Sequence, residues 1–126
     1  MKSDPNILRR KTDHIDSVLS LGTKREGHSP FDDIQLTHNA LPEFNLATMP
    51  LNTEFLGKAL KLPFLISSMT GGPLKAERIN LNLAEAAQEL GIAMGVGSQR
   101  VALLDQGARG LTAEIRAIAP DIPLYA

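Results

Sequence analysis

Three short stretches of this 126-residue sequence carry side chains that could bind a ligand. "SSMTGG" at 67–72 ends an apolar run with hydroxyls and two glycines, which let backbone N–H groups approach a phosphate or another polar group. "GSQR" at 97–100 ends a second apolar run, and its Arg100 can bind phosphate through two parallel hydrogen bonds. "RRK" at 9–11 adds cations near His14.

Each stretch also has an interpretation without a ligand. The first can be a capped turn between a strand and a helix, the second a solvated loop, and the third a solvated basic arm. His28 and His38 lie in loop-like stretches, and the histidines show no metal-ligand spacing. Gly95 and Gly97 lack the third glycine of a dinucleotide-binding fingerprint. From these residues alone, both interpretations stay open.

A strand–helix–strand–helix–strand order is expected to position two of these stretches. Apolar runs begin at Phe64, Ile92 and Ile122 and predict short buried strands, covered on both faces. Two helices lie between them, one running from Gly72 to a Gly91 cap and one beginning at a Thr112 cap. The order predicts a parallel sheet, whose strands bind ligands at their carboxyl ends. The apolar face expected for the first helix comprises Ile79, Leu83, Ala86, Ala87 and Leu90.

The segment before this sheet is expected to hold a basic arm, a short helix and a hairpin. Residues 1–22 combine the arm with a helix from Ile15 to Leu21, which Gly22 ends. Residues 23–33 are rich in glycine, proline and charge and predict a loop. A hairpin is predicted around Gly57.

The composition excludes several classes of function. Hydrophobic residues make up 43% and charged residues 21%, as in a folded globular protein. The net charge of -1 predicts neither a nucleic-acid nor a membrane partner. The absence of cysteine excludes disulfides and thiolate nucleophiles. No apolar run approaches the ~20 residues of a membrane span and no signal core is present, so we expect a cytoplasmic protein.

Four motifs together resemble one enzyme family. They are "RKTDH" at 10–14, "ALPE" at 40–43, "TEFLGKALKLPFLISSMTGG" at 53–72 and "GVGSQR" at 95–100. This combination is similar to the type 2, flavin-dependent isopentenyl diphosphate isomerases. The resemblance implies a TIM-type (β/α)8 barrel that isomerises isopentenyl diphosphate to dimethylallyl diphosphate. It also implies FMN that is reduced by NADPH, Mg2+ bound to the diphosphate, and a homo-oligomer when complete.

The resemblance also implies roles for residues at the matching motif positions. Substrate binding is expected at Arg10, Lys11, His14, Ser98, Gln99 and Arg100. FMN contacts are expected at Ser67, Ser68, Met69, Thr70 and Ser98. The Mg2+ ligand and the FMN phosphate site are expected outside this chain.

The length is short for such a barrel, which typically needs ~250 residues. We therefore expect residues 1–126 to form a single incomplete domain, the N-terminal part of the barrel with about three parallel strands, inactive alone. Two alternatives stay open. One is a different FMN barrel, such as a relative of the hydroxy-acid oxidases, and the other is a non-catalytic fragment that binds a partner through its open strand edge.

Overall fold

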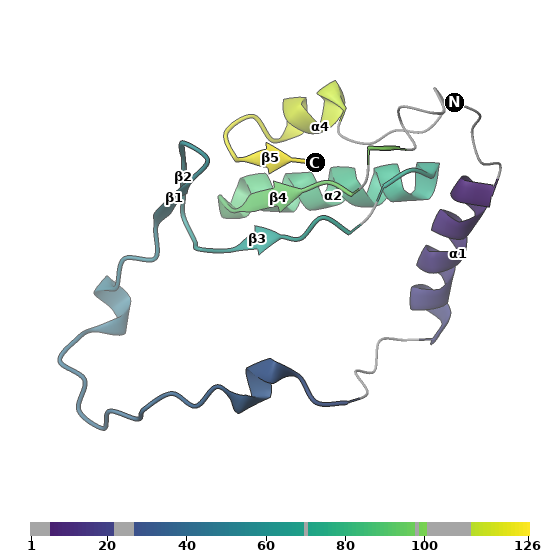
Figure 1. The fold of residues 1–126 in the computed structure, drawn as a ribbon. Coiled ribbons are helices and arrows are strands. Elements are labelled where there is room, and N and C mark those ends of the chain that lie inside the picture. Colours follow the sequence, from purple (N-terminus) through teal and green to yellow (C-terminus); the bar gives the residue numbers. More distant parts are fainter. Residues whose placement is uncertain (1–5, 22–26, 70, 98, 101–111) are drawn as a thin grey trace.

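A computed structural model describes residues 6–21, 27–69, 71–97, 99–100 and 112–126 (Figure 1). These residues form an α/β fold with a parallel sheet and a separate hairpin. The helices are α1 (Asn6–Leu21), α2 (Leu74–Leu90) and α4 (Ala113–Ile118), and 3-10 turns cover Pro30–Asp33 and Leu46–Thr48. The strands are β1 (Thr53–Phe55), β2 (Lys58–Leu60), β3 (Leu65–Ile66), β4 (Ala93–Gly95) and β5 (Leu124–Tyr125).

The sheet has the strand order β3-β4-β5, and both pairs are parallel. Ile66 pairs with Met94, and Met94 pairs in turn with Leu124. Helix α2 connects β3 to β4, so the predicted helical crossover is confirmed here. Because all three strands run the same way, their carboxyl ends lie at one edge of the sheet, the edge predicted to bind a ligand.

Strand burial differs from the prediction at one edge of the sheet. The central strand β4 is buried at every residue, as expected for a strand covered on both faces. Phe64 and Leu65 are 63% and 49% exposed, so the prediction of a buried first strand is wrong. The reason is that β3 is an edge strand with one strand neighbour among the described residues.

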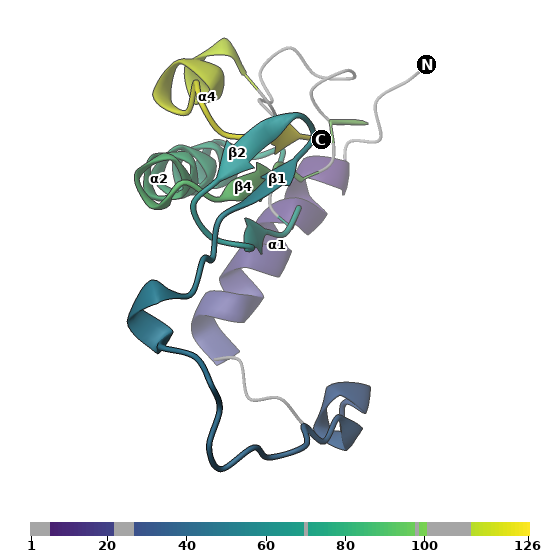
Figure 2. The same ribbon diagram turned by 90° about the vertical axis from the view of Figure 1, so that its left-hand side faces the viewer.

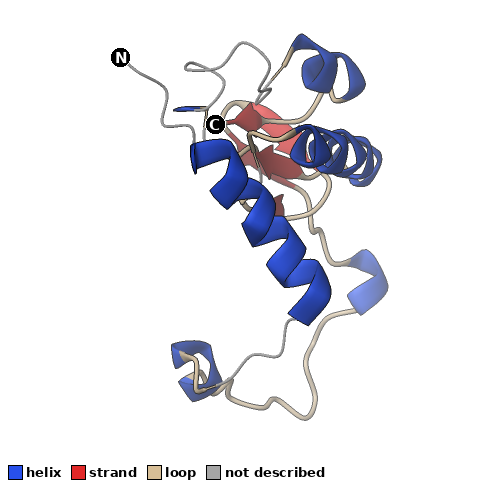
Figure 3. Ribbon diagram, turned by 90° about the vertical axis from the view of Figure 1, so that its right-hand side faces the viewer, coloured by secondary structure: helices blue, strands red, loops and turns tan. Residues whose placement is uncertain are grey.

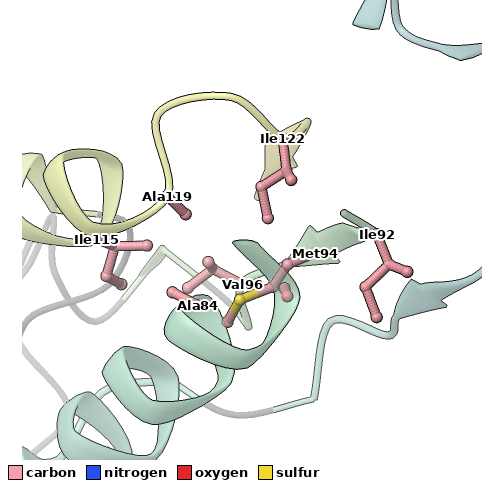
Figure 4. Close-up of a cluster of buried hydrophobic side chains, with 8 residues drawn as sticks. Ala84, Ile92, Met94, Val96, Ile115, Ala119 and Ile122 are labelled. Atoms are coloured by element: carbon pink, nitrogen blue, oxygen red, sulfur yellow. The ribbon is translucent and has the colours of Figure 1, made fainter. Parts of the chain in front are cut away.

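The hydrophobic core lies between the sheet and the two crossover helices (Figure 4). Alternate residues Ile92, Met94 and Val96 of the β4 segment join the core, as the two-residue period of a strand requires. Ile115 of α4 is fully buried beside them. Core members from the helices and the following loop are Ala84, Ala87, Ala119 and Ile122.

The face that α2 turns to the core agrees only in part with the one predicted, since Ala87 is buried in the core and Leu83 packs against it. Its buried residues are Ala76, Asn80, Ala84 and Ala87. Leu90, predicted on the apolar face, is 51% exposed, and Ala86 is exposed as well. The buried side chains are small and recur every three or four residues, so this stripe packs close to the sheet and fixes the helix rotation. The predicted Gly91 cap is confirmed, with φ 64°.

Helix α1 begins at Asn6 rather than at the predicted Ile15. Ile7, Lys11 and Ile15 recur every four residues and are all half-buried. The aliphatic stem of Lys11 therefore extends the apolar stripe of α1 from Ile15 toward Ile7. A simple hydrophobicity pattern counts lysine as polar and so places the start of the stripe at Ile15. An ion pair of 3.9 Å between Arg9 and Asp13 spans one turn of the same helix.

The predicted hairpin is confirmed at β1 and β2, with Phe55 paired to Lys58. Its two turn residues, Leu56 and Gly57, both have positive φ, the geometry of the tight turns that suit twisted hairpins. The predicted Thr112 cap is also confirmed, since its hydroxyl accepts a hydrogen bond from the Ile115 amide.

The hairpin and α1 lie at opposite ends of the parallel sheet (Figure 1). Figure 2 views the sheet from the side of the hairpin, and Figure 3 views it from the side of α1. The strands point toward α1, which crosses in front of their carboxyl ends. Between α1 and the hairpin, residues 27–52 extend away from the sheet and carry both 3-10 turns (Figure 1). Large exposed apolar side chains in this extended segment are Phe31, Ile34, Leu36, Leu41, Phe44, Leu46, Met49 and Leu51.

Candidate functional site

The carboxyl ends of β3 and β4 are joined by a side-chain hydrogen bond. The hydroxyl of Ser68 donates to the Val96 carbonyl over 2.7 Å. This bond brings the "SSM" residues of the first stretch beside the start of the "GSQR" stretch. Two of the three sequence-predicted stretches therefore meet at one edge of the sheet.

Gly95 lies under this junction in a space that has no room for a side chain. A Cβ atom there would lie 2.9 Å from the Ser68 Cβ and 2.9 Å from two ring atoms of Tyr125. The Tyr125 ring in turn packs edge-on against Phe55 of the hairpin, with ring centroids 6.2 Å apart. The close approach of strand backbone and aromatic ring therefore requires glycine at residue 95.

A cavity of about 350 Å³ lies between α1 and the loop that follows β3. Lys11 and His14 of α1 and Met69 of the loop all line it. Two residues predicted to bind substrate and one predicted to contact the cofactor are thus brought together. The remaining lining residues are Ile15, Val18, Leu19, Gly71 and Ile79.

An ion pair ties α1 to α2 beside this cavity. The Lys75 ammonium lies 2.7 Å from the Asp16 carboxylate, and both side chains are about half exposed. The two residues are 59 positions apart in the sequence, so no local pattern indicated this contact. Such an exposed pair contributes modestly to the placement of α1 against α2.

The apolar wall of the cavity was not predicted from the sequence. Ile15, Val18 and Leu19 were identified as a helical repeat but not as part of a site. The signal was present in the spacing, because Lys11, His14, Ile15 and Val18 stand at i, i+3, i+4 and i+7 of one helix. A helical face that carries both cationic and apolar groups indicates a surface for an amphiphilic partner or ligand.

The other described site residues are not among those that line the cavity. Ser67 and Arg100 are exposed, Arg10 lies on the exposed surface of α1, and the Gln99 amide donates to the Gly97 carbonyl over 3.1 Å. The predicted contacts at Thr70 and Ser98 lie outside the described residues.

Within the described part of the chain, no group of three or more His, Asp or Glu side chains is arranged to hold a metal ion. None of its helices combines the length and the apolar character that crossing a bilayer requires.

Comparison with known proteins identifies relatives of the chain. Proteins named isopentenyl-diphosphate delta-isomerase are similar over nearly its whole length. The protein from Xanthobacter autotrophicus is 57% identical over 119 residues, which are 94% of this chain and 35% of the relative. The protein from Cronobacter sakazakii is 51% identical over 98% of this chain and 36% of the relative. The protein from Rickettsia akari is 50% identical over 100% of this chain and 37% of the relative.

The chain thus spans about a third of the length of these curated relatives. A sequence profile of the FMN-dependent dehydrogenase family matches residues 8–116, which include most of α1, the hairpin, β3, α2 and β4. The chain therefore belongs to the FMN-dependent dehydrogenase family.

Proposed function

We propose that this chain is part of an isopentenyl-diphosphate isomerase that uses FMN in a TIM-type barrel. The observation that carries the proposal is the cavity in which Lys11 and His14 lie opposite Met69, beside the carboxyl end of β3. The names and high identity of the relatives supply the substrate class. The parallel strands with a helical crossover support the proposed barrel, because such a barrel repeats this unit.

The groups at the sheet edge fit one edge of a flavin ring. Ser67 and Met69 are exposed there, so a flat polar ligand can reach these residues. Because the Ser68 hydroxyl donates its proton to Val96, its oxygen retains lone pairs that can accept a hydrogen bond. We assign Ser67, Ser68, Met69, Thr70 and Ser98 to FMN contacts.

The diphosphate of the substrate requires concentrated positive charge. In this proposal Arg10, Lys11 and Arg100 provide that charge, because guanidinium and ammonium groups form strong charge-assisted hydrogen bonds with phosphate oxygens. His14 lines the same cavity as Lys11 and can donate to a phosphate oxygen. Ser98 and Gln99 complete the proposed contacts with substrate.

Isomerisation moves the double bond by adding a proton to its terminal carbon and removing one from the methylene carbon next to the double bond, on the side of the diphosphate. Reduced FMN, when bound, would supply the acid and base chemistry for these transfers. The residues of this chain hold the diphosphate and fix the position of the hydrocarbon relative to the sheet edge. NADPH would reduce the flavin, and Mg2+ would offset diphosphate charge through a ligand in the rest of the protein.

In this proposal, the remaining strands of the barrel correspond to the part of the relatives that this chain does not span. The complete enzyme would be a cytoplasmic homo-oligomer. An oxidase of 2-hydroxy acids, the first alternative, would bind flavin at the same sheet edge but would not need a diphosphate-binding site. The alternative of a non-catalytic fragment would use the exposed edge of β3 to bind a partner.

A chimera tests the proposal directly. The 126 residues replace the matching segment of the Xanthobacter autotrophicus relative, and the purified chimera is assayed with FMN, NADPH and Mg2+. We expect conversion of isopentenyl to dimethylallyl diphosphate and no oxidation of 2-hydroxy acids. A chimera that folds, binds FMN and leaves isopentenyl diphosphate unchanged contradicts the proposal. The fragment alternative predicts instead that the chain co-elutes with a partner on size exclusion and supports no turnover in the chimera.

A further inference from the structure

We propose that residues 27–52, called the outer segment below, pack over a strand–helix unit that lies along the open edge of β3. The chain spans 35% to 37% of the length of its relatives, and the unit belongs to the part that it does not span. The proposal concerns a surface outside the ligand site. It rests on the proposed function only for the barrel topology.

The outer segment presents apolar side chains in the same spacing twice. Each of its 3-10 turns carries one apolar residue, a second three positions later and a third two positions after that. Residues three apart lie on one face of a 3-10 turn, and residues two apart share one face of an extended chain. The first apolar group is Phe31, Ile34 and Leu36, and the second is Leu46, Met49 and Leu51.

The described part of the chain leaves these two apolar groups largely uncovered. Phe31 is 80% exposed and Leu36 is 89% exposed. Both turns are nevertheless held in shape by caps from within the segment. The Ser29 hydroxyl accepts a hydrogen bond from the Phe31 amide over 3.3 Å, and the Asn45 side chain accepts one from the Ala47 amide over 3.0 Å. A surface that is already shaped loses less conformational entropy when a partner covers it.

The path of the outer segment is far longer than the sheet requires. It leads from α1, at the carboxyl ends of the strands, to the hairpin at their amino ends (Figure 1). Helix α2 runs beside the sheet and rises about 26 Å over its 17 residues, at ~1.5 Å per residue. An extended chain covers that distance in about eight residues at ~3.3 Å each. Residues 27–52 can span about 80 Å, so the chain makes a wide detour.

The detour lies on the side of the sheet where β3 forms the edge (Figures 1 and 2). Among the described strands, β3 pairs with β4 alone, and Phe64 and Leu65 beside this edge are exposed. A closed barrel has no open edge, so in the proposed barrel a further strand pairs with β3. The helix of that strand then joins the outer ring of helices to which α2 belongs.

The second turn of the outer segment lies on the side of this helical ring. Figure 2 shows Leu46–Thr48 on the same side of the sheet as α2. A chain that leaves the sheet at α1, passes this turn and returns at the hairpin therefore runs outside the added helix. Its two apolar groups cover that helix. A second copy of the chain could cover the same groups but would not account for the detour around β3.

Photo-crosslinking in the chimera with the Xanthobacter autotrophicus relative identifies the occupant. A benzoylphenylalanine in place of Phe31 or of Phe64 reports the contacts of the outer segment and of the β3 edge, and each replacement keeps an aromatic side chain. We expect both probes to crosslink within one chain, to a strand and the helix next to it in the part derived from the relative. Mass spectrometry of the digested protein locates these crosslinks.

Two other results of the crosslinking overturn the proposal. Crosslinks between two chains, seen as a species of doubled mass on a denaturing gel, would assign the apolar groups to a second copy. Absence of any crosslink from the probe at Phe31 would show that the outer segment stays uncovered in the larger protein.

One substitution in two contexts measures the packing. Leu36→Ser should lower the urea midpoint of the chimera and leave that of the 126-residue chain unchanged, because Leu36 is exposed in the chain alone. Burial of a leucine side chain corresponds to about a ten- to hundredfold shift in the unfolding equilibrium. Gln35→Ser is the matched control, since Gln35 is an exposed polar neighbour, and should change neither midpoint.

An unchanged midpoint for Leu36→Ser in the chimera contradicts the proposal. This failure is distinct from failure of the proposed function. The latter gives a folded chimera that binds FMN and does not convert isopentenyl diphosphate, whatever the outer segment contacts.

Discussion

The hydroxyl of Ser68 and the carbonyl of Val96 are joined by a 2.7 Å hydrogen bond between two strand ends, 28 residues apart in the sequence. Neither atom belongs to the regular pairing of the strands, because β3 ends at Ile66 and β4 ends at Gly95. The bond therefore extends the contact between these strands past their last paired residues, to the edge where the proposed site lies.

Ser68→Ala removes this bond and should destabilise the fold. The Val96 carbonyl loses its side-chain donor, and a hydrogen bond contributes about 0.5–1.5 kcal/mol to stability. Urea denaturation of the chain measures the loss as a lower midpoint. Ser67→Ala is the control, since Ser67 is an exposed neighbour, and should leave the midpoint unchanged. Equal midpoints for the two variants would contradict the structural role of Ser68.

Gly95→Ala should destabilise the sheet more strongly than Ser68→Ala. The added methyl would meet the Ser68 Cβ and the Tyr125 ring at 2.9 Å, and overpacking of this kind costs about 1–3 kcal/mol. Thermal unfolding gives the loss as a lower Tm. In a Tyr125→Leu background the ring is absent, so the same substitution should cost clearly less. An equal decrease in Tm in both backgrounds would show that the Tyr125 ring does not cause the strain.

Asp16→Asn should loosen α1 from α2 by breaking the ion pair with Lys75. Exposed pairs contribute about 0.2–1 kcal/mol, so the effect is small and weakens with added salt. Hydrogen exchange of the α1 amides measures it as faster exchange at low salt. Asp13→Asn removes the same charge from the same helix without a contact to α2 and serves as the control. The exchanged pair Asp16→Lys with Lys75→Asp should restore protection, and failure to do so speaks against the ion pair.

Arg100→Ala in the active chimera should raise the KM for isopentenyl diphosphate. A charge-assisted hydrogen bond to phosphate contributes about 1.5–3 kcal/mol, which corresponds to about ten- to a hundredfold in affinity. Flavin content, read from absorbance after purification, should stay unchanged. Loss of flavin with unchanged KM would move Arg100 from the substrate to the cofactor.

The chain by itself should convert no isopentenyl diphosphate with FMN, NADPH and Mg2+ present. Within its described part no cluster of acidic and histidine side chains can hold the metal that offsets diphosphate charge. FMN should bind at less than stoichiometric amounts, because its phosphate has no assigned site here. Product analysis of the reaction mixture checks this prediction. Dimethylallyl diphosphate formed by the chain in the absence of other protein would refute it.

Features set by local interactions were predictable from the sequence. Gly91 ends α2 in the left-handed conformation, and Thr112 caps α4, because each needs only its near neighbours. The parallel order followed from the alternation of apolar runs and helical patterns. The first two stretches of polar residues were correctly expected at one sheet edge, and the Ser68 bond to Val96 places them together.

Features set by packing between distant segments were not predictable. The rotation of α2 depends on how its small residues Ala84 and Ala87 pack into the core, whereas the hydrophobicity pattern also placed the larger Leu90 on the buried face. The start of α1 was missed because the stem of Lys11 acts as an apolar side chain in the stripe. The pair of Asp16 and Lys75 needs the folded arrangement of two helices to exist at all.

The two kinds of strand pairing in this chain imply an order of events during folding. Phe55 and Lys58 pair directly across their turn, and hairpins of this kind form in about 1–10 μs. Pairing of Leu65 with Ala93 instead requires the whole of α2 to be enclosed between them, and such non-local contacts form slowly. We expect the hairpin and α2 to form first and the parallel sheet afterwards. The edge that holds the proposed site is then among the last parts of the molecule to be completed.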